Sequence, residues 1–195
     1  MRRWFALSTV AILLVFVSSD LVKTAQAGSE DSQKKTRASV KRDKIDVMAR
    51  DTLDELFSKS PAAKKLYDRA AAYAVFDNLK FAIFLTGGGG VGVAVDKASG
   101  KRIYMKMGTA GIGVGLGGQK YQIVFFFQDH DTFDKFVQEG WQADSSANAV
   151  AGVAGANAEA TFQDGVAFYM LTEGGLMANI DISGTKFWKY DKLNS

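Results

Sequence analysis

The chain has 195 residues, the length of one domain with a short leader, and 47% of them are apolar, so a buried core can form. It contains no cysteine, which excludes disulfides, thiol nucleophiles and thiolate metal sites. The formal net charge is +3, but without residues 1–27 the chain has 21 basic and 20 acidic residues, so we expect no nucleic-acid partner.

Residues 1–27 have the pattern of a secretory signal peptide. Arg2 and Arg3 precede a short apolar run, Ala6–Val17, and Ala25-Gln26-Ala27 has the small residues of a cleavage site. We therefore predict an exported protein in the periplasm or outside the cell, with membrane association left open. The lack of cysteine excludes a bacterial lipoprotein. An uncleaved anchor is the alternative, although the apolar run is short for a membrane span.

Residues 28–39 are polar and without periodicity, so we expect a flexible lead-in to a single domain, residues 40–195. The first element of that domain is Val40–Ser58, whose apolar residues recur at three- and four-residue steps and predict an amphipathic helix. This helix begins with Lys41, Arg42 and Lys44. It either packs on the domain or lies on a membrane surface, where these cations would bind lipid phosphates.

Ser60-Pro61 predicts the start of a second helix, which we expect to end near Ala72, because serine is a favoured N-cap and proline a favoured first residue. From Tyr73 the pattern changes to strands separated by glycine. Gly90–Asp96 and Lys101–Met107 flank the sequence KASG and predict a hairpin.

The second strand of that hairpin places Arg102, Tyr104 and Lys106 on one face, so Arg102 and Lys106 form a second candidate lipid-binding surface. Further strands are predicted at Phe81–Thr86, Ala110–Gly117 and Lys120–Gln128. The last of these is apolar on both faces in its middle, as expected for a central strand.

One helix is inserted at Thr132–Glu139, with Asp131 as its expected N-cap. The C-terminal third predicts a run of hairpins, with strands at Ala156–Phe162, Val166–Leu171, Leu176–Ile182 and Thr185–Tyr190. We therefore expect an α+β fold, in which a curved antiparallel β-sheet or partial barrel with glycine-rich strands is joined by two N-terminal helices and the inserted helix.

Gly113, Gly115 and Gly118 spell G-x-G-x-x-G, the spacing of a dinucleotide-binding loop. That loop needs a following helix, whereas a strong strand pattern follows here, so we do not expect a nucleotide site. The glycines instead alternate with apolar residues in two rows, Gly88, Gly90 and Gly92, and Gly111, Gly113, Gly115 and Gly117. Each row gives a strand one bare face, which suits close packing of backbone or helix, closure of a small barrel, or a shallow groove for an acyl chain or flat partner.

No residue pattern predicts catalysis, a metal or a cofactor. His130 is the only histidine, and we expect it in a solvated loop between Asp129 and Asp131. Ser145 and Ser146 lack the G-x-S-x-G context of a nucleophile. We therefore predict a protein that is not an enzyme and binds no cofactor.

The order of the motifs is informative as a set. AYAVFDNLKFAIFLTGGGGVGVAV is followed by GTAGIGVGLGGQKYQIVFFFQDHDTFDKF, WQADSSANAVAGVAGANAEA and GVAFYMLTEGGLMANIDISGTKF. From about Asp51 to Tyr190 the chain resembles the SYLF-domain family, a lipid-binding domain also found in yeast actin-patch proteins.

The resemblance implies a non-enzymatic domain that binds phospholipids, with exported members in bacteria and actin binding in some eukaryotic members. It associates lipid binding with the N-terminal amphipathic helix and its cations, here Lys41, Arg42 and Lys44. Where eukaryotic members have a Gly-Pro…Gly-Arg run this chain reads AGVAGAN, so a role that depends on that arginine is not expected. Two hypotheses remain, binding of an anionic phospholipid or membrane surface, and a protein-interaction or scaffold domain of the cell envelope.

Overall fold

The computed structural model describes residues 18–142, 161–176 and 184–195. Contacts divide the chain into two units, Met1–Val40 and Lys41–Ser195. Helix α1, Ser18–Lys59, contains the boundary between them. Residues 28–39, expected to form a flexible lead-in, are helical, and from residue 32 onward their side chains are almost all exposed.

The second-unit part of α1 is an amphipathic helix that packs on the domain. Its apolar face is buried, with exposed fractions of 6% or less at Ile45, Ala49, Leu53 and Leu56. Helix α2, Pro61–Arg69, follows, and its N-cap Ser60 accepts a hydrogen bond from the backbone N–H of Ala63 at 3.2 Å. The predicted start of α2 is confirmed, but the helix ends at Arg69 because the chain enters strand β1 at Ala72.

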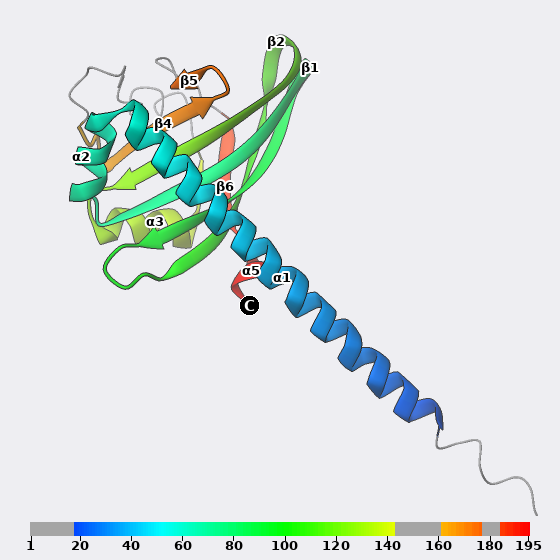
Figure 1. The fold of residues 1–195 in the computed structure, drawn as a ribbon. Coiled ribbons are helices and arrows are strands. Elements are labelled where there is room, and N and C mark those ends of the chain that lie inside the picture. Colours follow the sequence, from blue (N-terminus) through cyan, green and yellow to red (C-terminus); the bar gives the residue numbers. More distant parts are fainter. Residues whose placement is uncertain (1–17, 143–160, 177–183) are drawn as a thin grey trace, which may run out of the picture. The chain divides into compact units, whose positions relative to one another are not determined.

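Two long strands dominate the second unit. β1, Ala72–Asp96, and β2, Arg102–Phe127, pair antiparallel along their length and are joined by the predicted KASG turn. The segments expected as separate strands are continuous within them. The register shifts between Ile83 and Leu85, and such a bulge bends a strand pair. Figure 1 shows β1 and β2 bending together.

The bend brings the two halves of β1 against each other. A Cβ atom on Gly90 would lie 2.1 Å from the backbone oxygen of Asp77, and one on Gly92 would lie 2.2 Å from that of Val75. No side chain fits at either position. The bare face of β1 therefore meets the strand's own backbone, while the surroundings of Gly111, Gly113, Gly115 and Gly117 lie outside the description.

β2 is the central strand of one antiparallel sheet. β1 pairs with one edge, and two later strands share the other edge: β4, Val166–Thr172, pairs with residues 121–127, and β6, Thr185–Lys189, pairs with residues 105–109. The sheet ends in β3, Trp141–Gln142, beside β6, and β5, Gly175–Leu176, beside β4. Among the described residues β6 pairs with β2 and β3. Most of each strand expected at Ala156–Phe162 and Leu176–Ile182 lies outside the described residues.

Aromatic residues fill the core between the halves of the bent sheet. Phe125 is fully buried, and its ring centroid lies 5.2 to 6.3 Å from those of six aromatic neighbours, including Phe76, Phe168 and Phe187. Helix α3, His130–Glu139, closes this core with Phe133, Phe136 and Val137. The fold is α+β with a curved antiparallel sheet, as predicted.

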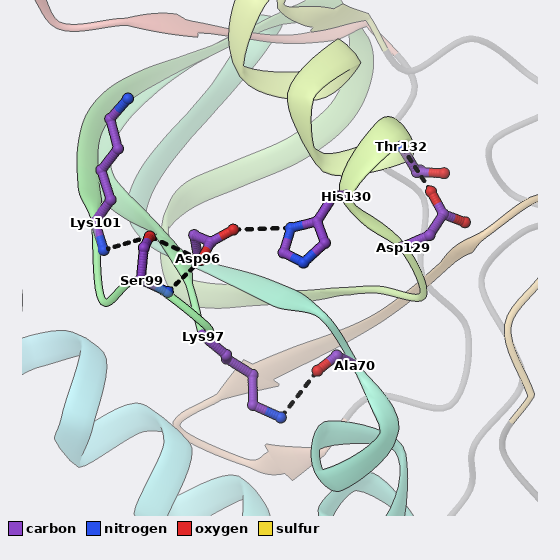
Figure 2. Close-up of polar contacts among 8 residues, drawn as sticks. All are labelled: Ala70, Asp96, Lys97, Ser99, Lys101, Asp129, His130 and Thr132. Atoms are coloured by element: carbon purple, nitrogen blue, oxygen red, sulfur yellow. Dashed lines mark hydrogen bonds and ion pairs between the residues drawn. The ribbon is translucent and has the colours of Figure 1, made fainter.

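The predicted N-cap of α3 is wrong by two residues. Asp129, not Asp131, caps the helix, and its Oδ1 accepts a hydrogen bond from the backbone N–H of Thr132 at 2.8 Å (Figure 2). Both aspartates suit a helix start, but only Asp129 has the extended backbone of a cap, since Asp131 already lies in the first turn.

Candidate functional site

Lysines from two distant segments, α1 and β2, contact Tyr190. Lys41 of α1 donates a hydrogen bond from Nζ to the Tyr190 hydroxyl at 3.1 Å, and Lys106 of β2 places Nζ 4.2 Å from the ring centroid. The hydrogen bond from Lys41, together with the charges of Lys41, Lys106 and Lys192, holds the pKa of Tyr190 below its usual value. Lys41, Lys106, Tyr190 and Lys192 are called the Tyr190 cluster below.

The last residues of the chain are anchored, which fixes this cluster in place. The side-chain amide of Asn194 in helix α5, Asp191–Asn194, pairs with the backbone of Tyr104, accepting from its N–H at 2.9 Å and donating to its carbonyl at 2.7 Å. Arg42 donates from Nη1 to the carbonyl of Leu193 at 2.9 Å. Arg42 therefore positions the C-terminal segment, in addition to contributing a positive charge.

The remaining predicted cations lie in different surroundings. Lys44 is exposed on α1, and the described part of the chain gives its side chain no hydrogen bond or ion pair. Arg102 of β2 has Nε 3.6 Å from Oδ2 of Asp46, which also accepts a hydrogen bond from the Tyr104 hydroxyl at 3.1 Å. Because this carboxylate offsets its charge, Arg102 is a weaker candidate for an anionic ligand than Lys106.

Arg102 also lines a cavity of about 370 Å³ between α1 and the sheet. Two carboxylates, Asp43 and Asp46, face it together with the guanidinium groups of Arg50 and Arg102. Burial, and the nearby Asp46 carboxylate, raise the pKa of Tyr104 to about 12, so its hydroxyl stays a neutral donor. The charges that line this cavity balance one another, and it has no preference for an anion.

The apolar face of Val40–Ser58 is covered by the domain. Ile45, Leu53 and Leu56 point into packed surroundings, and the large apolar residues exposed on this segment are Val40 and Val47. Of the two alternatives for this segment, the structure shows packing on the domain, which leaves its apolar face unavailable to a membrane surface. Among the predicted cations of this segment, Lys44 is exposed and Lys41 and Arg42 are partly exposed.

His130 is exposed to solvent, as expected, but it is the first residue of α3 and not a loop residue. Figure 2 shows its Nδ1 directed at Asp96, 2.8 Å from Oδ2, and the other carboxylate oxygen of Asp96 accepts from the backbone N–H and the hydroxyl of Ser99. These hydrogen bonds to Ser99 are the main reason that the pKa of Asp96 is lowered. Ser99 bonds to the carboxylate and not to the imidazole, so the order of groups is not that of a nucleophilic triad. Ser145 and Ser146 lie outside the described residues.

Lys97, in the turn between β1 and β2, has a structural role. Its Nζ donates to the backbone carbonyl of Ala70 at 2.9 Å (Figure 2). It also donates to the backbone carbonyl of Tyr67 at 2.6 Å and lies 4.4 Å from the centroid of the Tyr67 ring. These contacts satisfy carbonyls at the C-terminal end of α2. The β1–β2 turn is thereby fixed to α2 by Lys97 and to α3 by Asp96.

Sequence analysis did not single out the aromatic residues beside the cations. Trp188 lies in β6, two residues before Tyr190, and is 44% exposed. Its indole ring lies over Gly108 of β2. The C-terminal sequence KFWKYDK, in which lysines and aromatic residues are interspersed, was the available sign of this surface. Its meaning depends on the pairing of β6 with β2, which places Trp188 opposite Lys106.

Comparison with known proteins finds one matching family model and a similar bacterial protein. Residues 108–195 match the family model Ysc84, described as "Las17-binding protein actin regulator". The chain is also similar to Beta cell expansion factor A of Aeromonas veronii, with 45% identity over 144 residues, which are 74% of this chain and 55% of that protein. Residues 108–195 therefore match a Ysc84, or SYLF, domain. It spans little more than half the length of this relative.

The Ysc84 match covers most of β2 and everything that follows, including Lys186, Trp188 and Tyr190. Ysc84 is a family of binding domains and not a known family of enzymes. Within the residues that the structure describes, no helix is long and apolar enough to cross a membrane, and no three acidic or histidine side chains are grouped as metal ligands.

Proposed function

We propose that this Ysc84 domain is an exported, non-enzymatic module that binds the surface of membranes rich in anionic phospholipid. The observation that carries the proposal is the Tyr190 cluster, in which lysines from α1, β2 and α5 are held on one surface. Basic residues near an anionic bilayer each contribute about 1 kcal/mol of binding free energy. The exposed Lys44 adds a further charge on α1.

Export is supported by the signal-like leader, residues 1–27, and by the name of the relative, which describes an effect on beta cells. Fractionation of an expressing bacterium tests this part of the proposal. Recovery of the protein in the periplasm or medium, shortened by the leader, is the expected result. Retention of the unshortened chain in the cytoplasm would contradict it.

Vesicle flotation tests membrane binding. The protein recovered from the periplasm or medium should float with anionic vesicles at low salt, be released at high salt, and ignore neutral vesicles. Replacing Lys44 and Lys106 by alanine should weaken binding by roughly 10- to 30-fold. Lys64 and Lys65 of α2, replaced together, are the matched control for lost charge.

The variant in which Lys41, Arg42 and Lys44 are all replaced by alanine should also lose binding. Because Lys41 and Arg42 hold Tyr190 and Leu193, its melting temperature must be compared with that of the wild type before its affinity is interpreted. Conversion of Arg42 to lysine keeps the charge and serves as the control. Failure of the wild-type protein to bind either kind of vesicle would refute the proposal.

The second candidate function is a protein-interaction domain of the cell envelope. It is favoured by the description of the matching family model, which names binding to another protein. Pull-down from envelope extract that has been depleted of lipid distinguishes the two functions. A partner captured there by the wild type would support the interaction domain.

A further inference from the structure

The outer face of the sheet beyond α1 is exposed. Strand register places three rows of residues across β1, β2 and β6 on this face: Gly87 and Ala110; Gly89, Gly108 and Lys186; and Val91, Lys106 and Trp188. The preceding rows of the same face contain Val93, Val95, Arg102 and Tyr104, and α1 covers these. The open rows are called the Trp188 face below.

Three glycines leave much of the Trp188 face without side chains. A Cβ atom on Gly87 would meet nothing within 4 Å, and one on Gly89 would meet only the backbone oxygen of Met107, at 3.7 Å. A Cβ atom on Gly108 would lie 3.0 Å from Cη2 of Trp188, so the indole rests on a bare part of the sheet. The ring is held from below and remains 44% exposed above.

The charged residues of the Trp188 face are both lysines. Lys106 lies directly opposite Trp188 in the register, and Lys186 lies opposite Gly108, while none of the residues in the open rows is acidic. Tyr190, and Lys41 at the start of the second-unit part of α1, extend this positive surface. An exposed indole that packs on the sheet and has lysines beside it suits the interface of an anionic bilayer, where tryptophan prefers the headgroup level and lysine binds phosphate.

We propose that the Trp188 face is the surface that docks on the membrane, with Trp188 inserted at the headgroup level and the lysines on lipid phosphates. The inference rests on the proposed function and specifies its contact surface, which is the sheet and not the apolar face of α1. Gly87 and Gly89 have no side chains, so the bilayer can approach the backbone of β1 closely at these two positions.

Fluorescence quenching tests the insertion of Trp188. The protein recovered from the periplasm or medium, with Trp141 replaced by phenylalanine, retains Trp188 as its only tryptophan once the leader is removed. Anionic vesicles that carry bromine near the headgroup end of the acyl chain should quench and blue-shift its emission. Bromine at the chain terminus should quench less, because the indole is expected to stay at the interface.

Matched variants measure the contribution of the face. Trp188→Ala should weaken binding to anionic vesicles on the order of tenfold, from the apolar area that no longer leaves water. Val47→Ala removes a side chain of equal exposed fraction, 44%, from α1 and should leave the affinity unchanged. Gly87→Glu should also weaken binding, whereas Ala98→Glu, in the exposed β1–β2 turn, should not.

The outcomes separate the inference from the proposed function. Wild-type binding with no quenching of Trp188, or with full affinity in both Trp188→Ala and Gly87→Glu, overturns the docking face and leaves membrane binding intact. Absence of wild-type binding overturns both. Thermal melts of each variant show that the domain is folded in every comparison.

Discussion

Replacement of Gly92 by alanine should destabilise the domain, because this glycine lies against the backbone of its own strand. The new Cβ atom would lie 2.2 Å from the carbonyl oxygen of Val75 and 2.5 Å from Cδ1 of the fully buried Phe76. Ordinary contacts require more than a further ångström, and neither neighbour can move without shifting the sheet. Overpacking of this kind costs about 1–3 kcal/mol, and the rigid neighbours place Gly92→Ala near the upper end.

The assay is urea denaturation followed by far-ultraviolet circular dichroism. A loss of roughly 2–3 kcal/mol corresponds to a melting temperature lower by about 5–10 °C for a chain of this size. Gly87→Ala is the control, because its Cβ atom meets nothing within 4 Å, and it should be neutral or stabilising by about 0.4–1 kcal/mol. Equal stability of the two variants would refute the close approach of the two halves of β1.

Three further perturbations test the contacts around the site. Lys97→Ala should lower the free energy of unfolding by about 1–2 kcal/mol, measured in urea, because the α2 carbonyls lose their partner; an unchanged midpoint would contradict this. Asp96 has a pKa below its usual value of 3.8, so its ionised form stabilises the fold above that pH. The stability difference between wild type and Asp96→Asn should be full at neutral pH and shrink as the pH falls below about 4; a difference independent of pH would contradict the assignment. Lys41→Ala should raise the pKa of Tyr190 in a spectrophotometric titration, since the lysine stabilises the phenolate; no shift would show that Lys41 does not reach the ring.

Local signals in the sequence predicted the elements whose causes are local. Ser60 and Pro61 mark the start of α2, and KASG forms the β1–β2 turn. In each case a few neighbouring residues set the backbone conformation. The same reasoning rejected a nucleotide loop at Gly113–Gly118, and these residues lie within β2, which continues as a strand to Phe127.

The arrangement of the site residues depends on long-range packing, which local sequence patterns do not specify. Lys41 and Tyr190 are 149 residues apart, and their contact depends on the docking of α1 and α5 on the same sheet. Trp188 lies opposite Lys106 only because β6 pairs with β2, and the turn residue Gly184 before β6 does not specify this pairing. The amphipathic pattern of Val40–Ser58 is the same for a helix on a membrane and a helix on a protein, and the burial of Ile45 and Leu56 distinguishes them.

Equilibrium binding to anionic vesicles tests the central claim most directly when two double variants are compared. One replaces Lys106 and Lys186 on the Trp188 face by alanine, and the other replaces Lys64 and Lys65 of α2, so the net charge is the same in both. The account predicts that the first binds roughly 30-fold more weakly than the wild type at low salt and that the second binds nearly as well. Equal affinities of the two variants would show that net charge alone, and not this face, governs the interaction.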